Sequence, residues 1–206
     1  VFLLVTVNNP PTTFNFIDRF LVTAEAYGIE TILVFNKIDT LNETTLDEQL
    51  YMQHVYQEIG YKCLRVSSTE GKGIAELKAL MIGKTTMFSG HSGVGKSTLV
   101  NALVENADRA TGSVNDATGR GRHTSSSAIA LALNPGWIID TPGVRSFGVA
   151  HVDSKRVISA FSEFNEAIEH CPKNCSHNEE SCALNSWNLD DVSKSRLESL
   201  RRLLKA

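Results

Sequence analysis

The chain contains little cysteine, little proline and few aromatic residues, and it has no long hydrophobic run. Its 206 residues include 4 Cys, 5 Pro and 7% aromatic residues, which excludes a disulfide-rich scaffold and a proline-rich fibre. No stretch reaches the roughly 18 consecutive apolar residues of a membrane span, and no signal-peptide pattern occurs at residue 1. We therefore expect a cytoplasmic protein with no membrane partner.

The chain also lacks a strong charge of either sign. It carries 20 Lys and Arg against 23 Asp and Glu, a formal net charge of -3. This balance creates no field that attracts nucleic acid to the whole molecule, so an RNA partner has to be met by a local basic patch. A length of 206 residues accommodates one main domain and a smaller one.

Apolar, β-branched runs alternate with helical patterns over the first part of the sequence. The runs cover residues 1–7, 31–35, 62–66, 85–89, 128–133 and 137–139. A helical spacing of apolar residues follows the first run, at Phe14, Ile17, Phe20, Leu21 and Ala24. A less regular one follows the second run, at Leu46, Leu50, Val55 and Ile59. This alternation predicts an α/β fold with a mainly parallel sheet covered on both faces.

The pattern changes after about residue 150, so we predict one domain over 1–150 and a small helical domain over 151–206. Asp153 can cap a helix with an apolar stripe at Val157, Ile158, Phe161, Phe164 and Ile168. A last helix is expected at about 190–205, with basic residues at Lys194, Arg196, Arg201, Arg202 and Lys205. This basic face either contacts RNA or is simply solvated.

A phosphate-binding motif lies at 90–97, which reads GHSGVGKS. The motif G-x-x-x-x-G-K-[ST] is matched between an expected strand and an expected helix by Gly90, Gly95, Lys96 and Ser97. The glycines let backbone N–H groups surround phosphate oxygens, while Lys96 reaches the β- and γ-phosphates and Ser97 holds Mg²⁺. The expected nucleotide site also includes Ser92, Gly93, Val94 and Thr98.

The segment WIIDTPG at 137–143 offers a second magnesium element. Asp140 ends an apolar strand, where its carboxylate can hold Mg²⁺ through water, and the Gly143 N–H can donate to the γ-phosphate. The same residues also suit an ordinary strand-ending turn. Their position about forty residues after the phosphate loop favours the magnesium interpretation.

A possible guanine-reading tetrad occurs in TILVFNKID at 31–39, with Asn36, Lys37 and Asp39. The Asp39 carboxylate can accept hydrogen bonds from guanine N1–H and the exocyclic amine, a pattern that adenine cannot offer. In isolation such a tetrad is more often a solvated turn. The later segment VSSTEGKG at 66–73 resembles the backbone loop that contacts the guanine oxygen, with Ser67 and Ser68 in the relevant places.

These elements stand in an unusual order, because the base tetrad precedes the phosphate loop. The order of tetrad, base loop, phosphate loop and metal strand is nevertheless the usual GTPase order rotated. We infer a circular permutation, which a sheet tolerates when the original termini lie close together at the surface. The motifs predict a Mg²⁺-dependent enzyme that hydrolyses GTP to GDP and phosphate.

The chain resembles the circularly permuted GTPases of the RsgA (YjeQ) family in five segments, which are, in order, NKID, GHSGVGKSTLVNAL, GRGRHTSSS, IIDTPGVRSFG and CPKNCSHNEESCAL. The resemblance implies binding to the small ribosomal subunit and its rRNA late in assembly, with GTP hydrolysis stimulated by that subunit. It also implies an OB-fold domain upstream of residue 1. We expect a monomer. The alternative function is a nucleotide-responsive RNA or protein adaptor in which hydrolysis is incidental.

The pattern leaves more than one interpretation of the residues for the hydrolytic step. Many GTPases carry a water-orienting Gln after the glycine of the metal strand, whereas this chain has Val144, so slow unassisted hydrolysis is expected. His123 can orient the water, although it is equally well a surface histidine or an RNA contact. Thr124 resembles the switch threonine. The neighbouring Arg120 and Arg122 contact phosphate of the nucleotide or of RNA, or are solvated.

A cysteine and histidine cluster lies in the tail, at Cys171, Cys175, His177 and Cys182. Three thiolates and one imidazole form a sufficient tetrahedral set for one structural Zn²⁺ ion. A catalytic zinc is disfavoured because no ligand position remains open. The alternative is a reduced cluster without metal.

Overall fold

The computed structural model describes residues 1–108, 129–133, 135–140 and 151–205. The chain divides into two compact units, and each is described by itself. The first unit comprises Val1–Thr12, Thr31–Gln57 and Tyr61–Arg145. The second comprises Thr13–Glu30, Glu58–Gly60 and Ser146–Ala206.

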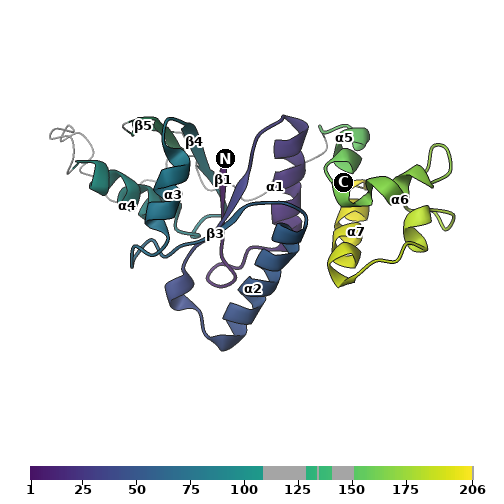
Figure 1. Cartoon of the computed structure of the whole chain (residues 1–206), viewed down its shortest axis with the longest axis horizontal. Helices are drawn as coiled ribbons and strands as arrows, with labels where there is room; N and C mark the ends of the chain where they lie inside the picture. The colour runs from purple at the N-terminus through teal and green to yellow at the C-terminus, as the bar shows by residue number, and fades with distance from the viewer. Residues whose placement is uncertain (109–128, 134, 141–150, 206) are drawn as a thin grey trace. The chain divides into compact units, whose positions relative to one another are not determined.

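The first unit is built on a six-stranded sheet with the order β3-β2-β1-β4-β6-β5 (Figure 1). The strands are β1 (Phe2–Val5), β2 (Ile32–Phe35), β3 (Cys63–Arg65), β4 (Thr85–Ser89), β5 (Ile129–Ala132) and β6 (Trp137–Asp140). Neighbouring strands run parallel except β5 and β6, which are antiparallel. Each strand falls on one of the apolar runs of the sequence, so the predicted α/β fold is confirmed.

The helices of the first unit follow the strands. They are the 3-10 turn η1 (Ile38–Thr40), α2 (Glu43–Glu58), α3 (Ile74–Met81) and α4 (Lys96–Asp108). Helix α3 was not predicted from the sequence. It begins after Gly73, whose φ is +73° and whose added Cβ would lie 2.2 Å from the Arg65 carbonyl oxygen. Only glycine fits this approach of the loop to the end of β3.

The sheet is buried on both faces. Phe2 and Leu4 of β1 point to one face, where they join α3 and α4 in an apolar cluster that includes Leu77 and Leu103. The alternate residues Leu3, Val5, Leu33 and Phe35 are fully buried as well. Burial on both faces explains why the strands read as continuous apolar runs instead of alternating ones.

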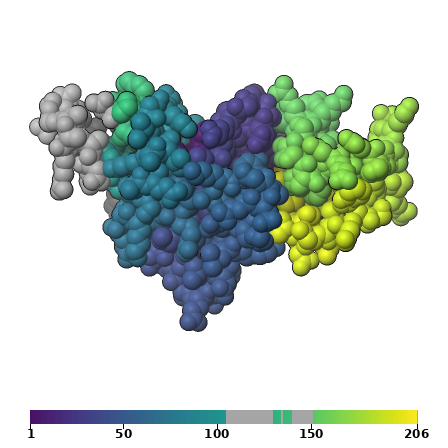
Figure 2. All heavy atoms as spheres, in the orientation of Figure 1, coloured from purple at the N-terminus to yellow at the C-terminus, as the bar shows by residue number. Residues whose placement is uncertain are grey.

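The predicted apolar stripe of α2 is wrong at Leu50, which is 43% exposed. The buried residues of the helix are Gln49, Met52, Val55 and Tyr56. At 3.6 residues per turn, positions 49, 52 and 56 share one face and position 50 lies about 100° away from 49. The polar Gln49 is therefore buried and Leu50 is not. Leu50 lies on the solvent-exposed side of α2 (blue in Figure 2).

The second unit is helical and includes a segment from early in the sequence. Its elements are α1 (Phe14–Ala26), α5 (Ser154–Ser159), η2 (Ser162–Phe164), α6 (Asn165–Glu169), η3 (Ala183–Asn185) and α7 (Asp191–Leu203). Val22 of α1 shares an apolar core with Phe161, Phe164 and Leu200. None of the described helices combines the length and apolar character needed to cross a bilayer.

The helix predicted from Asp153 to Ile168 is broken in the structure. Asp153 caps α5 as predicted, because its Oδ1 accepts from the Lys155 N–H at 2.8 Å. The helix ends at Ser159, and Phe161 has a non-helical backbone with φ -109° and ψ 60°. This break lets the Phe161 and Phe164 rings stack in the core, with centroids 6.3 Å apart. The domain boundary at residue 150 stays a prediction, because 141–150 lie outside the described residues.

A buried ion network joins α1 to α7 inside the second unit. Arg196 donates from Nη1 to Asp18 Oδ1 and from Nε to Glu163 Oε1, the latter at 2.8 Å. Ser199 Oγ donates to Asp18 Oδ2. Asp18 and Arg196 are each 2% exposed, and the guanidinium carbon lies 4.2 Å from the centre of the Phe161 ring. Both oxygens of the buried Asp18 carboxylate are therefore bonded.

Replacing Arg196 with Leu leaves the Asp18 carboxylate buried without its cation. Loss of one partner of a buried pair typically costs about 3–5 kcal/mol. We expect a loss of that size in the free energy of unfolding, measured by urea denaturation followed by far-UV circular dichroism. The exposed Arg202 on the same helix provides the control, since Arg202→Leu should change it by less than about 0.5 kcal/mol. Equal small losses for both variants contradict the network's role.

Candidate functional site

Loops at the carboxyl edge of the parallel sheet carry the predicted site residues. Residues 36–40 follow β2, residues 66–70 follow β3 and residues 90–95 follow β4. Strands β1 and β4 are neighbours, while the chain proceeds from β1 to β2 on one side and from β4 to β6 on the other. In open α/β sheets, ligands bind outside the carboxyl ends of the strands at such a reversal point.

The glycines of the phosphate loop are required by close backbone and side-chain contacts. Gly90 has φ +147°, and a Cβ there would lie 2.8 Å from the Leu4 carbonyl oxygen. Gly95 has φ +94°, and a Cβ there would lie 2.5 Å from Asn36 Nδ2. The second contact shows that the loop and the base tetrad are packed directly together. The loop ends at α4 (Lys96–Asp108), and the free backbone N–H groups of a helix N-terminus are suited to bind an anion.

Lys96 lies at the start of α4, and its ammonium folds back over the loop. Its Nζ donates to the carbonyl oxygens of Gly90 at 2.8 Å and His91 at 2.9 Å. The residue is 7% exposed. Burial lowers the pKa of His91, and the nearby Lys96 charge lowers it further. The neighbouring Ser97 and Thr98 are exposed, so a ligand at the phosphate loop can reach them.

The Asn36 side chain connects three loops. Its Nδ2 donates to the Val94 carbonyl oxygen of the phosphate loop at 2.9 Å. Its Oδ1 accepts from the Ser68 hydroxyl at 2.9 Å and from the Ser68 N–H at 3.3 Å. Asn36 is 3% exposed, and its amide is bonded on both ends. The tetrad, base loop and phosphate loop are thus brought together as the sequence predicted.

Lys37 makes a second link across the same edge. The residue adopts a left-handed backbone with φ +64°, and its Nζ donates at 2.7 Å to the carbonyl oxygens of both Asn9 and Gly93. Asn9 follows β1, so the loop after that strand belongs to the same cluster. Sequence analysis did not include Asn9. Its contact is through the backbone, which leaves no residue-type signal in the sequence.

The Asp39 carboxylate is exposed but held in place. Thr69 Oγ1 lies 3.1 Å from Asp39 Oδ2 and 3.1 Å from Ser67 Oγ, which also accepts from the Glu70 N–H at 3.0 Å. Hydrogen bonding from Ser67 lowers the pKa of Asp39 most, and Thr69 adds to this effect. Thr69 was missed by sequence analysis, although a third hydroxyl residue after Ser67 and Ser68 was a visible signal.

Part of the predicted site is not described by the structure. Asp140 ends β6, where its backbone pairs with Phe88 of β4, so it lies beside the strand that leads into the phosphate loop. Nothing is described of its side chain. His123, Thr124 and Gly143 lie outside the described residues, as do Arg120, Arg122 and Val144.

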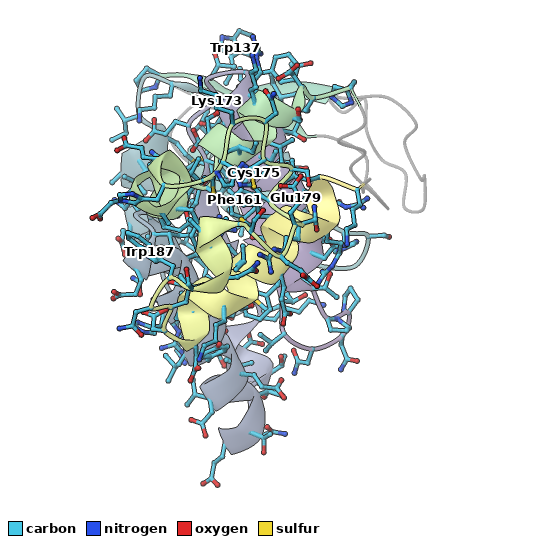
Figure 3. The ribbon with its side chains drawn as sticks, turned by 90° about the vertical axis from the view of Figure 1, so that its right-hand side faces the viewer. Trp137, Phe161, Lys173, Cys175, Glu179 and Trp187 are labelled. Atoms are coloured by element: carbon cyan, nitrogen blue, oxygen red, sulfur yellow. The ribbon has the colours of Figure 1, made fainter. Side chains whose placement is uncertain are left out.

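The second unit gathers the four predicted metal ligands. The ligand atoms of Cys171, Cys175, His177 and Cys182 all lie within 4.8 Å of one another. Figure 3 shows Cys175 in the loop between α6 and η3, with Glu179 close by. His177 has φ +61°, and its carbonyl oxygen accepts from Arg201 Nε at 2.8 Å. All four cysteines of the chain are free thiols.

The distances in this cluster fit a tetrahedral zinc ion. Zn–S bonds of about 2.3 Å at tetrahedral angles separate two thiolate sulfurs by about 3.8 Å. Cys171 and Cys182 Sγ lie 3.8 Å apart, and His177 Nδ1 lies 3.7 and 3.9 Å from them. Burial lowers the pKa of His177, which favours the neutral imidazole that a ligand requires. The residues therefore suit one structural Zn²⁺.

Comparison with known proteins then decides the family. The model of the family described as RsgA GTPase matches residues 1–150. The chain belongs to the RsgA GTPase family. Two curated relatives, each called Small ribosomal subunit biogenesis GTPase RsgA, come from Flavobacterium psychrophilum and Flavobacterium johnsoniae. They are 56% and 53% identical over 208 residues, which cover 99% of this chain. The chain spans 64% of the length of each relative.

Solved structures agree with this assignment to the RsgA family. YjeQ from Thermotoga maritima is similar with a TM-score of 0.76 and 30% identity, over 99% of this chain and 69% of that chain. YloQ, described as a circularly permuted GTPase, is similar with a TM-score of 0.71 and 25% identity, over 99% and 67%. The predicted fold class, a GTPase fold with circularly permuted motif order, is confirmed.

In this RsgA-family chain, Ser67→Ala and Thr69→Val should each raise the pKa of Asp39 toward its ordinary value of 3.8. The lowered pKa means that the stability from the ionised carboxylate is present above the unfolded pKa and is lost as pH falls through the folded pKa. Both variants should move that loss to higher pH. An NMR titration of the Asp39 carboxyl carbon measures the shift, with exposed Thr44→Val as the unchanged control. An unmoved titration curve contradicts the described bonds.

Metal content provides a separate prediction for the second unit. The purified chain should hold one zinc per molecule, and Cys182→Ser should lose most of it because three ligands bind zinc less tightly than four. Cys63→Ser should retain it, because Cys63 belongs to the first unit and burial raises the pKa of its thiol to about 12. Elemental mass spectrometry checks both variants. Full zinc retention by Cys182→Ser contradicts the assigned ligand set.

Proposed function

We propose that this RsgA-family chain hydrolyses GTP to GDP and phosphate in late maturation of the small ribosomal subunit, which stimulates the turnover. The single observation that carries the GTPase part is the Asn36 side chain, which bonds the phosphate loop at Val94 and the base loop at Ser68. A tetrad that was only a solvated turn would have no reason to be packed against a phosphate loop 58 residues further along the chain.

Guanine is the base that this site fits. The Asp39 carboxylate accepts and cannot donate when it is ionised, and its lowered pKa keeps it ionised at neutral pH. Guanine offers two adjacent donors, N1–H and the exocyclic amine, whereas adenine presents an acceptor at N1. Asn36, Lys37, Ser67 and Ser68 hold the loops around the base in this proposal.

The phosphates belong in the loop from Gly90 to Thr98. Lys96 Nζ, now bonded to two loop carbonyls, would exchange these for the β- and γ-phosphate oxygens. Ser92, Gly93, Val94 and Gly95 surround the phosphates mainly through their backbone, and the Gly143 N–H would donate to the γ-phosphate. Ser97 and Asp140 supply oxygen ligands of the kind that Mg²⁺ prefers. The ion would neutralise charge that develops on the γ-phosphate.

We assign the attacking water to His123, with Thr124 closing on the γ-phosphate. Val144 stands where many GTPases carry a glutamine, and its side chain cannot orient water. The isolated protein should therefore turn over slowly. A partner that holds His123 beside the attacking water would supply the missing organisation.

The partner assignment rests on the name of the relatives. Both Flavobacterium proteins are called small ribosomal subunit biogenesis GTPases, so we assign the small subunit and its rRNA as the partner. In this proposal the protein is a cytoplasmic monomer without a membrane partner, GTP and GDP are its nucleotides, and the second unit holds one structural Zn²⁺. The alternative function is an adaptor that responds to nucleotide and hydrolyses it only incidentally.

The test is GTP turnover with and without purified small ribosomal subunits, with large subunits as the control. We expect a rise of about a hundredfold or more with small subunits alone, which is the contribution of one positioned acid or base group. His123→Ala should lose this stimulated turnover while it keeps GTP binding.

The outcomes separate the proposals. Equal turnover with both subunits contradicts the partner assignment. Stimulation that is unchanged in His123→Ala contradicts the role of that residue. GTP-dependent binding to small subunits without any rise in turnover favours the adaptor over the enzyme. A chain that binds no guanine nucleotide contradicts the proposed function altogether.

A further inference from the structure

The second unit contains a cavity of about 400 Å³ that takes no part in the proposed nucleotide site. Its lining comes from the segment before α7 and from α7 itself, and includes Asn185, Trp187, Asn188, Lys194 and Arg201. Two of these side chains are cationic, one is a large aromatic and two are amides. No Asp or Glu is among the described residues that line it.

Trp187 provides a fixed aromatic surface in this cavity. Its ring stacks on the His170 ring, with centroids 5.8 Å apart and an interplanar angle of 27°. The side chain is half-buried, and Figure 3 shows it at the edge of the second unit, away from Cys175. An indole supported by a stacked neighbour is restrained before any ligand arrives, so less conformational entropy is lost on binding.

The two cations can reach an anionic ligand. Lys194 Nζ pairs with Asp191 Oδ1 at 3.2 Å, and their side chains are 63% and 92% exposed. Such an exposed pair contributes little, so the ammonium can turn to another anion at small cost. Arg201 donates from Nε to the His177 carbonyl oxygen and from Nη2 to Asn185 Oδ1. A guanidinium has five N–H donors, so these two bonds leave others for a ligand.

The loop that carries the predicted metal ligands positions two side chains of the cavity, Asn185 and Arg201. Asn185 Nδ2 donates to the carbonyl oxygens of Glu179 at 2.8 Å and Glu180 at 3.0 Å, and Asn185 Oδ1 accepts from Arg201. Arg201 is also bonded to the backbone of His177, one of the four metal ligands. The residues that bind zinc therefore also fix the side chains around the cavity.

We propose that this cavity binds an unpaired nucleotide of a single-stranded RNA. The base stacks beside Trp187, an amide such as that of Asn188 meets its edge, and Lys194 and Arg201 bind the phosphate. Aromatic stacking combined with cations is how proteins hold unpaired bases. An acidic peptide would use the cations and leave the aromatic ring unused. Such a site goes beyond the proposed GTPase activity and rests on the proposed assignment of rRNA as the partner. The test below uses free RNA without ribosomal subunits or GTP turnover, so either proposal can fail without the other.

The test measures binding of a fluorescein-labelled, ten-nucleotide single-stranded RNA by anisotropy, with excess GDP present. Replacing Trp187 with Leu should weaken binding roughly tenfold or more, because stacking of one base contributes that much. Trp187→Phe should retain most of the affinity. Trp137→Leu is the matched control, since Trp137 is 52% exposed and belongs to the first unit. Lys194→Gln should weaken binding and reduce its dependence on salt.

A second readout uses the fact that the chain has two tryptophans. In the Trp137→Phe variant all tryptophan fluorescence comes from Trp187, and the RNA should quench it saturably. Equal losses in Trp187→Leu and Trp137→Leu, or unchanged Trp187 fluorescence on RNA binding, would overturn the proposal. Equally tight binding of adenosine monophosphate would assign the cavity to free nucleotides, and quenching by an acidic peptide alone would assign it to protein. Retained zinc and circular dichroism show that each variant is folded.

Discussion

The buried amide of Asn36 is the contact on which the geometry of the proposed nucleotide site depends. Its Nδ2 donates to the Val94 carbonyl oxygen of the phosphate loop, and its Oδ1 accepts from the Ser68 hydroxyl of the base loop. Gly95 has to lack a side chain because this amide occupies the space beside it. A carboxylate of the same shape could not donate to Val94, so the position requires an amide. The residues that follow β2 therefore hold the phosphate loop through two side chains, Asn36 at Val94 and Lys37 at Gly93.

Circular permutation leaves this contact intact because it changes the connections and preserves the sheet. The loops of the proposed nucleotide site follow the carboxyl ends of parallel strands, and the order of strands in the sheet brings those ends together whatever their order along the chain. The second unit shows a related effect. Helix α1 lies between β1 and β2 in the sequence, yet its Val22 and Asp18 are buried with residues of α7. Residues that are neighbours in the sequence can therefore belong to different structural units of this chain.

Local patterns account for what the sequence predicted. The strands depend on periodicity over short segments, and the structure confirms them. The residues predicted for the tetrad, the phosphate loop and the metal cluster were recognised by their spacing, and the structure brings them together, while their roles stay predictions. Pairings between single side chains far apart in the sequence were missed. Nothing local marks Asp18 as the partner of Arg196, which lies 178 residues away. Leu50 was wrongly placed in the apolar stripe because the apolar spacing in this helix is irregular, and nothing local marks the polar Gln49 as a buried residue. Thr69 was passed over because its role depends on the fold of a loop.

The central claim is that the permuted motifs form one site that reads guanine through Asp39. Its most direct test is the dissociation constant of GDP and of xanthosine diphosphate for the wild-type chain and for Asp39→Asn. Xanthine has an oxygen where guanine has its exocyclic amine, so an amide donor suits it and a carboxylate does not. We expect wild type to prefer GDP and the Asp39→Asn variant to prefer xanthosine diphosphate. Unchanged preference for GDP in the variant would contradict the central claim.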